Sequence, residues 1–248
     1  MKKLFLGLIL LCSSVFAGTV NIAVAANVSY AIEELIKEFN KSNPDTKIQV
    51  TLGSSGKLVA QIKNGAPFNI FMSANMNFPK ALYDEKIAIT EPIIYAEGAL
   101  AMFSSKELDF SKGIDLIKDS SISKIAIANP KTAPYGTAAV EAIKNAGLEE
   151  FIKDKLVYAE SISQVLNYAT TAADIGFIAK SSLYEENMSK YKENKNWISL
   201  DTKLYKSIEQ GIVIINNAKD NAEVKAFYDF ILGAKAKEIF INYGYIVK

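Results

Sequence analysis

The stretch Thr51-Leu52-Gly53-Ser54-Ser55-Gly56-Lys57-Leu58 joins the end of an apolar strand to the start of a helix through small hydroxyl residues. Residues 48–52 are the expected strand, and residues 58–64 are a short expected helix that ends at Gly65. The first turn of a helix leaves backbone N–H groups without partners and carries about half a positive charge, so hydroxyl groups placed there favour a bound anion. The stretch therefore predicts one strand–helix unit of an α/β fold, with a candidate anion site at the junction.

Two other interpretations of this stretch exist. Ordinary helix capping explains Ser54 and Ser55 equally well from the local sequence. Residues 53–57 also resemble a phosphate-binding P-loop, but that motif needs glycine at the position of Thr51 and serine or threonine at that of Leu58. A nucleotide site is therefore not expected, while capping stays open beside anion binding.

Similar strand–loop–helix units lie on both sides of this stretch. Residues 20–25 are an expected strand, followed by the turn Ala26-Asn27 and an amphipathic helix for which Asn27 or Ser29 would be the N-cap. Residues 69–74 are the next expected strand, and residues 79–83 a helix. Alternating elements of these lengths predict a mostly parallel sheet with helices on both faces, whose ligands lie beyond the carboxyl ends of the strands.

The same order of elements repeats further along the chain and predicts a second lobe. An apolar strand at residues 98–103 begins it, residues 125–128 lead into the polar loop 129–136, and residues 156–158 lead into the loop 160–163. Four loops of one kind result, two in each lobe. We expect lobe 1 to comprise residues 18–97 and 210–248, and lobe 2 residues 98–209.

The first 17 residues predict an export signal. Lys2 and Lys3 form a basic start, residues 4–11 form an apolar run too short to span a bilayer, and small residues precede cleavage after Ala17. This signal indicates a periplasmic protein. The single cysteine, Cys12, would suit a lipoprotein instead, but the bulky Leu11 before it disfavours lipoprotein processing.

Composition excludes several kinds of chemistry. The chain has no histidine, and after cleavage it has no cysteine, so disulfides, thiol catalysis and the commonest zinc sites are not expected. The net charge of +1 argues against nucleic acid as a partner. All 28 basic residues are lysine, so an anion must be held by hydroxyls, amides, backbone N–H groups or a lysine point charge.

From Val20 to Lys248 the sequence resembles the periplasmic molybdate-binding proteins of ABC importers. The residues that carry this resemblance are spread over both halves of the chain: Ala26-Asn27, residues 53–56 with 61–67, residues 127–130 with 133–136, residues 176–179 and residues 234–244. One branch of the family has serine at the position of Asn27 and a ligand-contacting tyrosine at that of Ala179. The chain instead resembles the branch with asparagine in the first loop and Pro-Tyr-Gly in the third.

The resemblance implies a fold and a site. The fold is α/β, a two-lobed periplasmic-binding-protein fold of type II, each lobe a mixed, mostly parallel sheet flanked by helices. In that family neutral donors at helix starts hold a tetrahedral oxyanion between the lobes. Carried over, Asn27 and Ser55 would serve from lobe 1, with the backbone of Ala26, and Tyr135 and Ile162 would serve from lobe 2, mainly through backbone N–H groups.

The function implied is capture of molybdate, with tungstate beside it, and delivery to an ABC permease in the inner membrane. The protein would be a monomer without a cofactor, and molybdenum would be present only as bound molybdate. A binding protein of the same fold for another oxyanion such as sulfate, or for another small solute, stays an alternative. The enzyme alternative is an exported hydrolase with Ser55 as nucleophile and Lys57 as base. Lys57 lies two residues after Ser55 at a helix start, so its side chain points away from Ser55. We therefore expect no enzyme and interpret Lys57 as a bystander.

Overall fold

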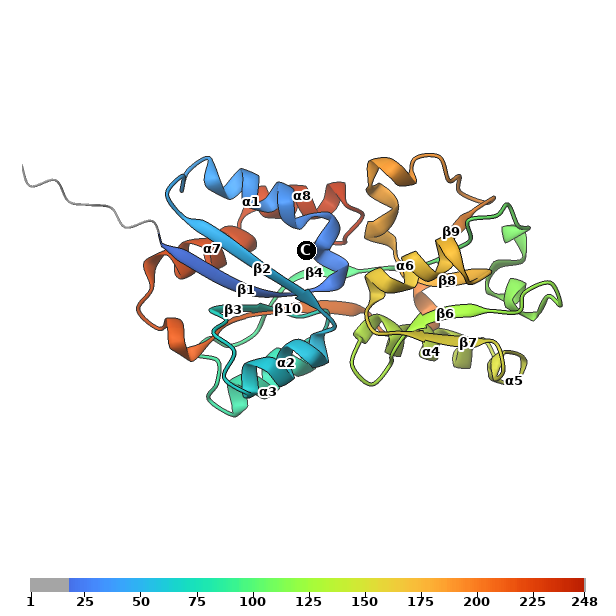
Figure 1. Ribbon diagram of the computed structural model, residues 1–248, viewed down its shortest axis with the longest axis horizontal. Helices are drawn as coiled ribbons and strands as arrows, with labels where there is room; N and C mark the ends of the chain where they lie inside the picture. The colour runs from blue at the N-terminus through green and yellow to red at the C-terminus, as the bar shows by residue number, and fades with distance from the viewer. Residues whose placement is uncertain (1–17, 248) are drawn as a thin grey trace, which may run out of the picture.

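The structure, a computed structural model, describes residues 18–247, and all structural statements below concern that range. The predicted export signal, with Cys12 and the cleavage site, lies outside the described residues. The chain forms two lobes side by side, each built on a five-stranded sheet (Figure 1).

Lobe 1 is a sheet with helices on both faces. Its strand order is β2-β1-β3-β10-β4, in which β1 runs parallel to β2 and β3, whereas β10 is antiparallel to β3 and β4. The strands are β1 (Thr19–Ala25), β2 (Lys47–Gly53), β3 (Ile70–Met72), β4 (Ile93–Gly98) and β10 (Ile208–Ile214). The helices are α1 (Ile32–Asn40), α2 (Ser55–Lys63), α3 (Asn77–Asp84), α7 (Ala222–Leu232) and α8 (Ala234–Asn242).

The hydrophobic core of lobe 1 has two layers because its sheet is apolar on both faces. Phe39 of α1, Phe227 of α7 and Phe240 of α8 pack on one face. Leu58 of α2 and Leu82 of α3 pack on the other. Figure 1 shows the same division, with α1, α7 and α8 above the sheet and α2 and α3 below it.

Lobe 2 repeats this plan with the strand order β7-β6-β8-β5-β9. Here β6 runs parallel to β7 and β8, and β5 is antiparallel to β8 and β9. The strands are β5 (Leu100–Phe103), β6 (Ile125–Ala128), β7 (Leu156–Ala159), β8 (Ile175–Ala179) and β9 (Trp197–Ser199). The α-helices are α4 (Pro134–Asn145), α5 (Glu149–Ile152) and α6 (Ile162–Thr171).

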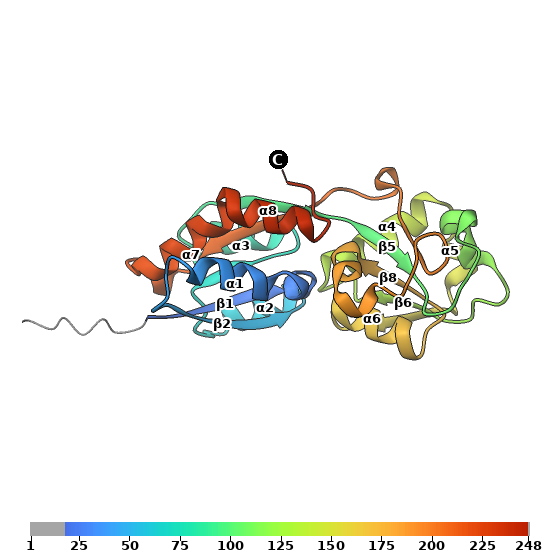
Figure 2. The same ribbon diagram turned by 90° about the horizontal axis from the view of Figure 1, so that it is seen from above.

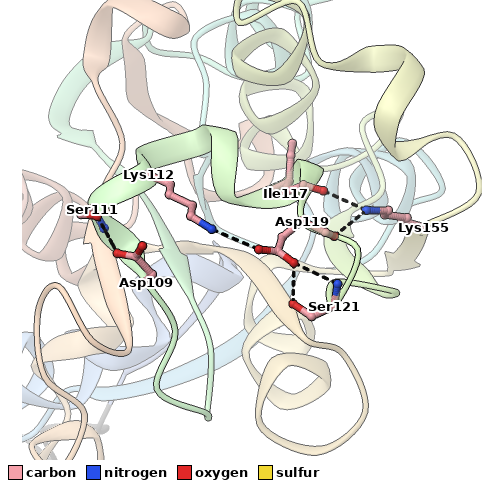
Figure 3. Close-up of polar contacts among 7 residues, drawn as sticks. All are labelled: Asp109, Ser111, Lys112, Ile117, Asp119, Ser121 and Lys155. Atoms are coloured by element: carbon pink, nitrogen blue, oxygen red, sulfur yellow. Dashed lines mark hydrogen bonds and ion pairs between the residues drawn. The ribbon is translucent and has the colours of Figure 1, made fainter.

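Several 3-10 segments complete the chain. They are η1 (Ala26–Tyr30), η2 (Phe110–Lys118), η3 (Lys180–Tyr184), η4 (Glu186–Met188), η5 (Thr202–Leu204) and η6 (Asn216–Ala218). The end of η2, in the part of lobe 2 remote from lobe 1, is held by polar contacts (Figure 3). The carboxylate of Asp119 accepts hydrogen bonds from the backbone N of Ser121 at 3.0 Å and from Nζ of Lys112 at 3.1 Å. Lys155 Nζ donates to the carbonyl oxygens of Ile117 and Asp119 at 3.0 and 3.1 Å.

The two lobes are connected twice. Strand β4 ends at Gly98 and β5 begins at Leu100, so one nearly continuous extended segment passes from the first sheet to the second. The return path runs from β9 to β10 through η5. Both connections run along the same side of the molecule in Figure 2. None of the helices within residues 18–247 is long and apolar enough to cross a membrane.

The expected α/β, two-lobed fold is confirmed, and the differences are local. Helix α2 begins at Ser55 rather than at Leu58. The expected N-cap at Asn27 or Ser29 is wrong, because residues 26–30 form the 3-10 segment η1 and α1 begins after Ala31 without a side-chain cap. The lobe boundaries at residues 98 and 210 stay a prediction.

Candidate anion-binding site

A small cavity lies where the carboxyl ends of strands from both sheets meet. Its volume is about 10 Å³, on the order of one water-sized sphere. Its lining combines residues that follow β1, β2 and β3 in lobe 1 with residues that follow β6 and β7 in lobe 2: Ala25, Ala26, Asn27, Gly53, Ser54, Ser55, Ala74, Ala133, Pro134, Tyr135 and Ile162. None of these lining residues carries a charge. The structure thus brings the five residues predicted from the sequence, Ala26, Asn27, Ser55, Tyr135 and Ile162, to one place.

Three α-helices begin at this cavity. Ser55 is the first residue of α2, Tyr135 the second of α4 and Ile162 the first of α6. Backbone N–H groups at these positions have no partner inside their own helix, and the positive end of each helix dipole lies beside them. Ala26 adds the first residue of η1. The site is therefore electropositive through dipoles and not through charged side chains.

The two serines of the second loop play different parts. Ser55 Oγ accepts a hydrogen bond from the backbone N of Ala74 at 3.0 Å, which ties α2 to the end of β3 and leaves the hydroxyl hydrogen free to donate. Ser54 occupies the N-cap position but makes no capping hydrogen bond with its side chain. Its Oγ is buried and has no partner among the described residues. The capping interpretation is therefore wrong for Ser54.

Ser54 was not among the residues predicted for the site. The sequence did contain a feature that indicates Ser54, because Ser54 is a second hydroxyl residue in the same loop as Ser55. Local sequence could not separate it from a cap, because an N-cap serine and a ligand-facing serine look alike. In the fourth loop a serine does cap its helix: Ser161 is the N-cap of α6 and accepts a hydrogen bond from the backbone N of Gln164 at 3.4 Å.

Asn27 is fully buried, and its side chain faces protein groups. Its Nδ2 donates to Oε1 of Gln210 at 2.7 Å and to Oη of Tyr245 at 3.0 Å. Its Oδ1 has no partner within the described part of the chain. Neither Gln210 nor Tyr245 was predicted to be near the site. Their contacts with Asn27 span 183 and 218 residues of sequence, so no local pattern could reveal them.

Tyr135 lines the cavity, and its side chain is almost fully buried. Its Oη lies 3.5 Å from Nε2 of Gln210. Burial of the ring raises the pKa of Tyr135 well above its usual value, and the nearby Tyr245 and Tyr95 raise it further. The phenol therefore stays neutral at any physiological pH.

The lobes also touch at the rim of the cavity. The backbone N of Gly56 donates to the carbonyl oxygen of Thr132 at 2.9 Å. Lys57 Nζ lies 2.6 Å from Oε1 of Glu160, and both side chains are 49% exposed. Lys57 was predicted to be a bystander. It does not line the cavity, but it forms an ion pair between the lobes, which the helix-start geometry alone did not indicate.

A metal centre is not built into this part of the protein. Residues 18–247 contain no group of three or more His, Cys, Asp and Glu side chains placed to hold a metal ion. Hydroxyls and backbone N–H groups are hydrogen-bond donors, whereas cations need acceptors. The arrangement suits an anion that offers only acceptor atoms.

Comparison with known proteins agrees with this geometry. Residues 20–246 match the family described as bacterial extracellular solute-binding protein. The molybdate-binding protein ModA of Azotobacter vinelandii is 35% identical over 242 residues, covering 97% of this chain and 94% of that protein. ModA of Rhodobacter capsulatus is also 35% identical, over 94% of this chain and 90% of that protein.

A solved structure shows the same likeness in three dimensions. The periplasmic molybdate-binding protein of Azotobacter vinelandii superposes with a TM-score of 0.86 at 28% sequence identity, covering 92% of this chain and 99% of that one. These relatives are binding proteins and not enzymes by their names. The match in sequence and fold supports one conclusion: the chain belongs to the family of bacterial extracellular solute-binding proteins.

Proposed function

We propose that this protein captures molybdate, and tungstate with it, between its two lobes and delivers the anion to an ABC permease in the inner membrane. The observation that carries the proposal is the uncharged cavity at which three helices begin, with hydroxyls from Ser54 and Ser55 beside them. Relatives named as molybdate-binding proteins cover nearly the whole chain and support the choice of anion.

The proposed donors come from both lobes. Lobe 1 offers the backbone around Ala26 and Asn27, the hydroxyl and backbone N–H of Ser55, and the hydroxyl of Ser54, which we add to the predicted set. Lobe 2 offers the backbone N–H groups of Tyr135 and Ile162. Since no counter-charge is available, these groups must replace the hydration of the anion by hydrogen bonds alone.

The energetics are sufficient for tight binding. A hydrogen bond to a charged group contributes about 1.5–3 kcal/mol. About six such bonds offset the ordering costs and leave micromolar or tighter affinity, about −8 kcal/mol or better. Because the donors lie in both lobes, the anion favours the closed form, and closure is the signal that the permease reads.

Selectivity follows from the same donors. N–H and O–H groups favour fully deprotonated anions over hydrogen phosphate, which needs an acceptor. The size of the cavity then distinguishes molybdate from the smaller sulfate. We further propose that the export signal is cleaved after Ala17 and that the mature protein acts as a monomer in the periplasm.

Titration calorimetry of the mature protein with molybdate, tungstate, sulfate and hydrogen phosphate tests the proposal. We expect micromolar or tighter affinity for molybdate and tungstate, and binding at least about tenfold weaker for sulfate, since a tenfold difference requires about 1.4 kcal/mol. Bound oxyanion should also raise the melting temperature by mass action. If molybdate and tungstate give neither heat nor a thermal shift while another solute does, the proposed ligand is wrong.

A further inference from the structure

A buried hydrogen-bond network that includes two of the cavity's lining residues is centred on Gln210. Gln210 lies on β10, at the point where the register with β4 shifts between Gln210 and Gly211. An irregularity of this kind re-aims side chains. The side chain of Gln210 reaches both lobes: its Oε1 accepts from Asn27 Nδ2 at 2.7 Å, and its Nε2 lies 3.5 Å from Tyr135 Oη.

Two tyrosines complete this network. Tyr95 Oη donates to Oε1 of Gln210 at 2.8 Å. Tyr245 Oη accepts from Nδ2 of Asn27 at 3.0 Å and donates to the carbonyl oxygen of Asn27 at 2.8 Å. All of these side chains are buried. One side-chain polar atom of the network, Oδ1 of Asn27, is without a partner among the described residues.

That unpaired atom has a chemical consequence for the cavity. Asn27 lines the cavity, and its Oδ1 can only accept hydrogen bonds. An oxyanion also offers only acceptors, so an amide oxygen beside it repels it. A buried acceptor without a partner is unfavourable in itself. Although the other groups of the cavity are donors, this orientation of the Asn27 amide is poorly suited to a fully deprotonated anion.

The same residues allow a second arrangement, in which both side-chain amides are reversed end for end. Nε2 of Gln210 then donates to Oδ1 of Asn27 and to Tyr95 Oη, and Oε1 of Gln210 accepts from Tyr135 Oη. Tyr95 Oη donates instead to the carbonyl oxygen of Ser73, which lies 3.4 Å away. Tyr245 Oη then donates to Oδ1 of Asn27, while the carbonyl oxygen of Asn27 keeps its hydrogen bond from Ser181 Oγ at 3.1 Å. The group of the network left without a partner is now the NH₂ of Asn27, which is a donor for an anion.

We propose that Gln210 is a positioning residue that sets which end of the Asn27 amide faces the anion, the two amides reversing together when the anion binds. This inference rests on the proposed oxyanion function. Gln210 does not line the cavity, so it acts through Asn27 and Tyr135. Because those two residues belong to different lobes, the reversal also couples anion binding to the contact between lobes.

Gly98 provides the space that this network needs. A Cβ atom at Gly98 would overlap Tyr135 Oη and lie 2.8 Å from Nε2 of Gln210. Any larger residue at this point would separate Gln210 from Tyr135. Gly98 is therefore needed in two places at once: it belongs to the segment that connects the lobes, and it leaves room for the contact between Gln210 and Tyr135.

Side-chain amide resonances in the NMR spectrum of the ¹⁵N-labelled protein test the reversal directly. The Gln210→Met variant identifies the Gln210 pair by its absence, and Asn27→Ala identifies the Asn27 pair. We expect both pairs to shift together when molybdate saturates the wild-type protein. If the Asn27 pair shifts while the Gln210 pair does not, or if neither shifts, the concerted reversal is overturned.

Calorimetry on substituted proteins tests the positioning role. In Gln210→Glu the carboxylate only accepts, so it holds the N–H groups of Asn27 away from the anion, and we expect molybdate affinity to fall about tenfold or more. Gln210→Met favours neither orientation of the Asn27 amide and should lose less molybdate affinity than Gln210→Glu. Gln49→Glu, at an exposed position on β2, adds the same charge away from the site and is the matched control.

Selectivity distinguishes positioning from mere support of the fold. Gln210→Glu should reduce the ratio of molybdate affinity to hydrogen phosphate affinity, because hydrogen phosphate can donate to Oδ1 of Asn27. If Gln210 only supported the fold, the affinities for both anions would fall by the same factor, and that result would overturn the proposal. If Gln210→Glu does not fold, the molybdate affinity of Gln210→Met and the NMR spectra of the wild-type protein test the role of Gln210 instead. If the wild-type protein binds no tetrahedral oxyanion, the proposed function itself is contradicted. If the wild-type protein and Gln210→Glu bind molybdate with equal affinity, only the role of Gln210 is contradicted.

Discussion

At the scale of single residues, Ser54 and Ser55 show how neighbouring hydroxyls acquire different energetics. Ser55 Oγ is part of the protein's own hydrogen bonding, through the backbone N of Ala74, whereas Ser54 Oγ is buried without a partner among the described residues. A buried unpaired hydroxyl lowers stability unless a ligand satisfies it. We infer that Ser54 is retained for binding and Ser55 for both binding and structure.

Alanine substitutions should separate these roles. We expect Ser54→Ala and Ser55→Ala each to weaken molybdate binding about tenfold, the loss of one hydrogen bond to a charged group. Ser55→Ala should also lower the melting temperature, because it leaves the N–H of Ala74 unpaired, whereas Ser54→Ala should leave it unchanged or raise it. Calorimetry and thermal denaturation measure the two effects, with the exposed Ser42→Ala as control. Equal affinities in wild type and Ser54→Ala would remove Ser54 from the site.

At this scale the sequence predicted which residues meet at the cavity better than it predicted their surroundings. Asn27, Ser55 and Tyr135 were carried over from the resemblance to molybdate-binding proteins, and the structure places all three in the cavity lining. Gln210 and Tyr245 were not predicted, because each reaches Asn27 from more than 180 residues away and no local spacing records such a contact.

At the scale of elements, the strand–loop–helix units were predictable, whereas the partners of the antiparallel strands were not. Units such as β2 with α2 show an apolar run followed by small polar residues and helical spacing. Strand β10 takes its place between β3 and β4 only after the chain returns from lobe 2, and its seven residues carry no signal of that partner. The predicted start of α2 lies three residues after the observed one, because the local sequence does not show whether Ser55 belongs to the loop or to the helix.

The end of η2 allows an element-scale prediction on acid stability. Hydrogen bonds from the backbone N of Ser121, from Lys112 and from the Ser121 hydroxyl lower the pKa of Asp119 to about 2 (Figure 3). A carboxyl group whose folded pKa lies below the unfolded value of about 3.9 stabilises the fold above that pH, and the stabilisation is lost as the pH falls towards 2.

We therefore expect Asp119→Asn to lower the melting temperature at neutral pH and to match wild type near pH 2. Thermal denaturation across that range measures the difference between the two proteins. Asp115→Asn is the control, because the carboxylate of Asp115 pairs only with Lys118 in the next turn, at 2.8 Å. A deficit of Asp119→Asn that persists undiminished at pH 2 would contradict the assignment.

At the scale of the whole molecule, contacts at the rim of the cavity join the lobes in addition to the buried network around Gln210. Gly56 approaches Thr132 so closely that a Cβ atom on the glycine would lie 3.0 Å from Cα of Thr132. Beside them the ion pair of Lys57 and Glu160 bridges the lobes. An exposed pair of this kind contributes at most about 1 kcal/mol. It can favour the closed form without locking it.

Removing this pair should speed release of the anion. We expect Lys57→Ala to speed molybdate dissociation by a factor of about two to five, which corresponds to 1 kcal/mol or less, and Glu160→Ala to do the same, with no further gain in the double variant. Stopped-flow measurements with a competing chelator of molybdate provide the rates. Lys63→Ala is the control, since its ion pair with Glu85 has the same 2.6 Å length but lies within lobe 1. Additive effects of the two rim substitutions would show that the pair does not act as a unit.

The uncharged lining of the cavity has a consequence for the surroundings in which the protein can work. Charges attract over a distance set by ionic strength, whereas hydrogen bonds from hydroxyls and backbone N–H groups form only at contact, and buried interactions are screened much less than exposed ones. Retention of the anion should therefore be nearly indifferent to salinity. A cell that moves between dilute and salty media can keep its cargo with one and the same protein.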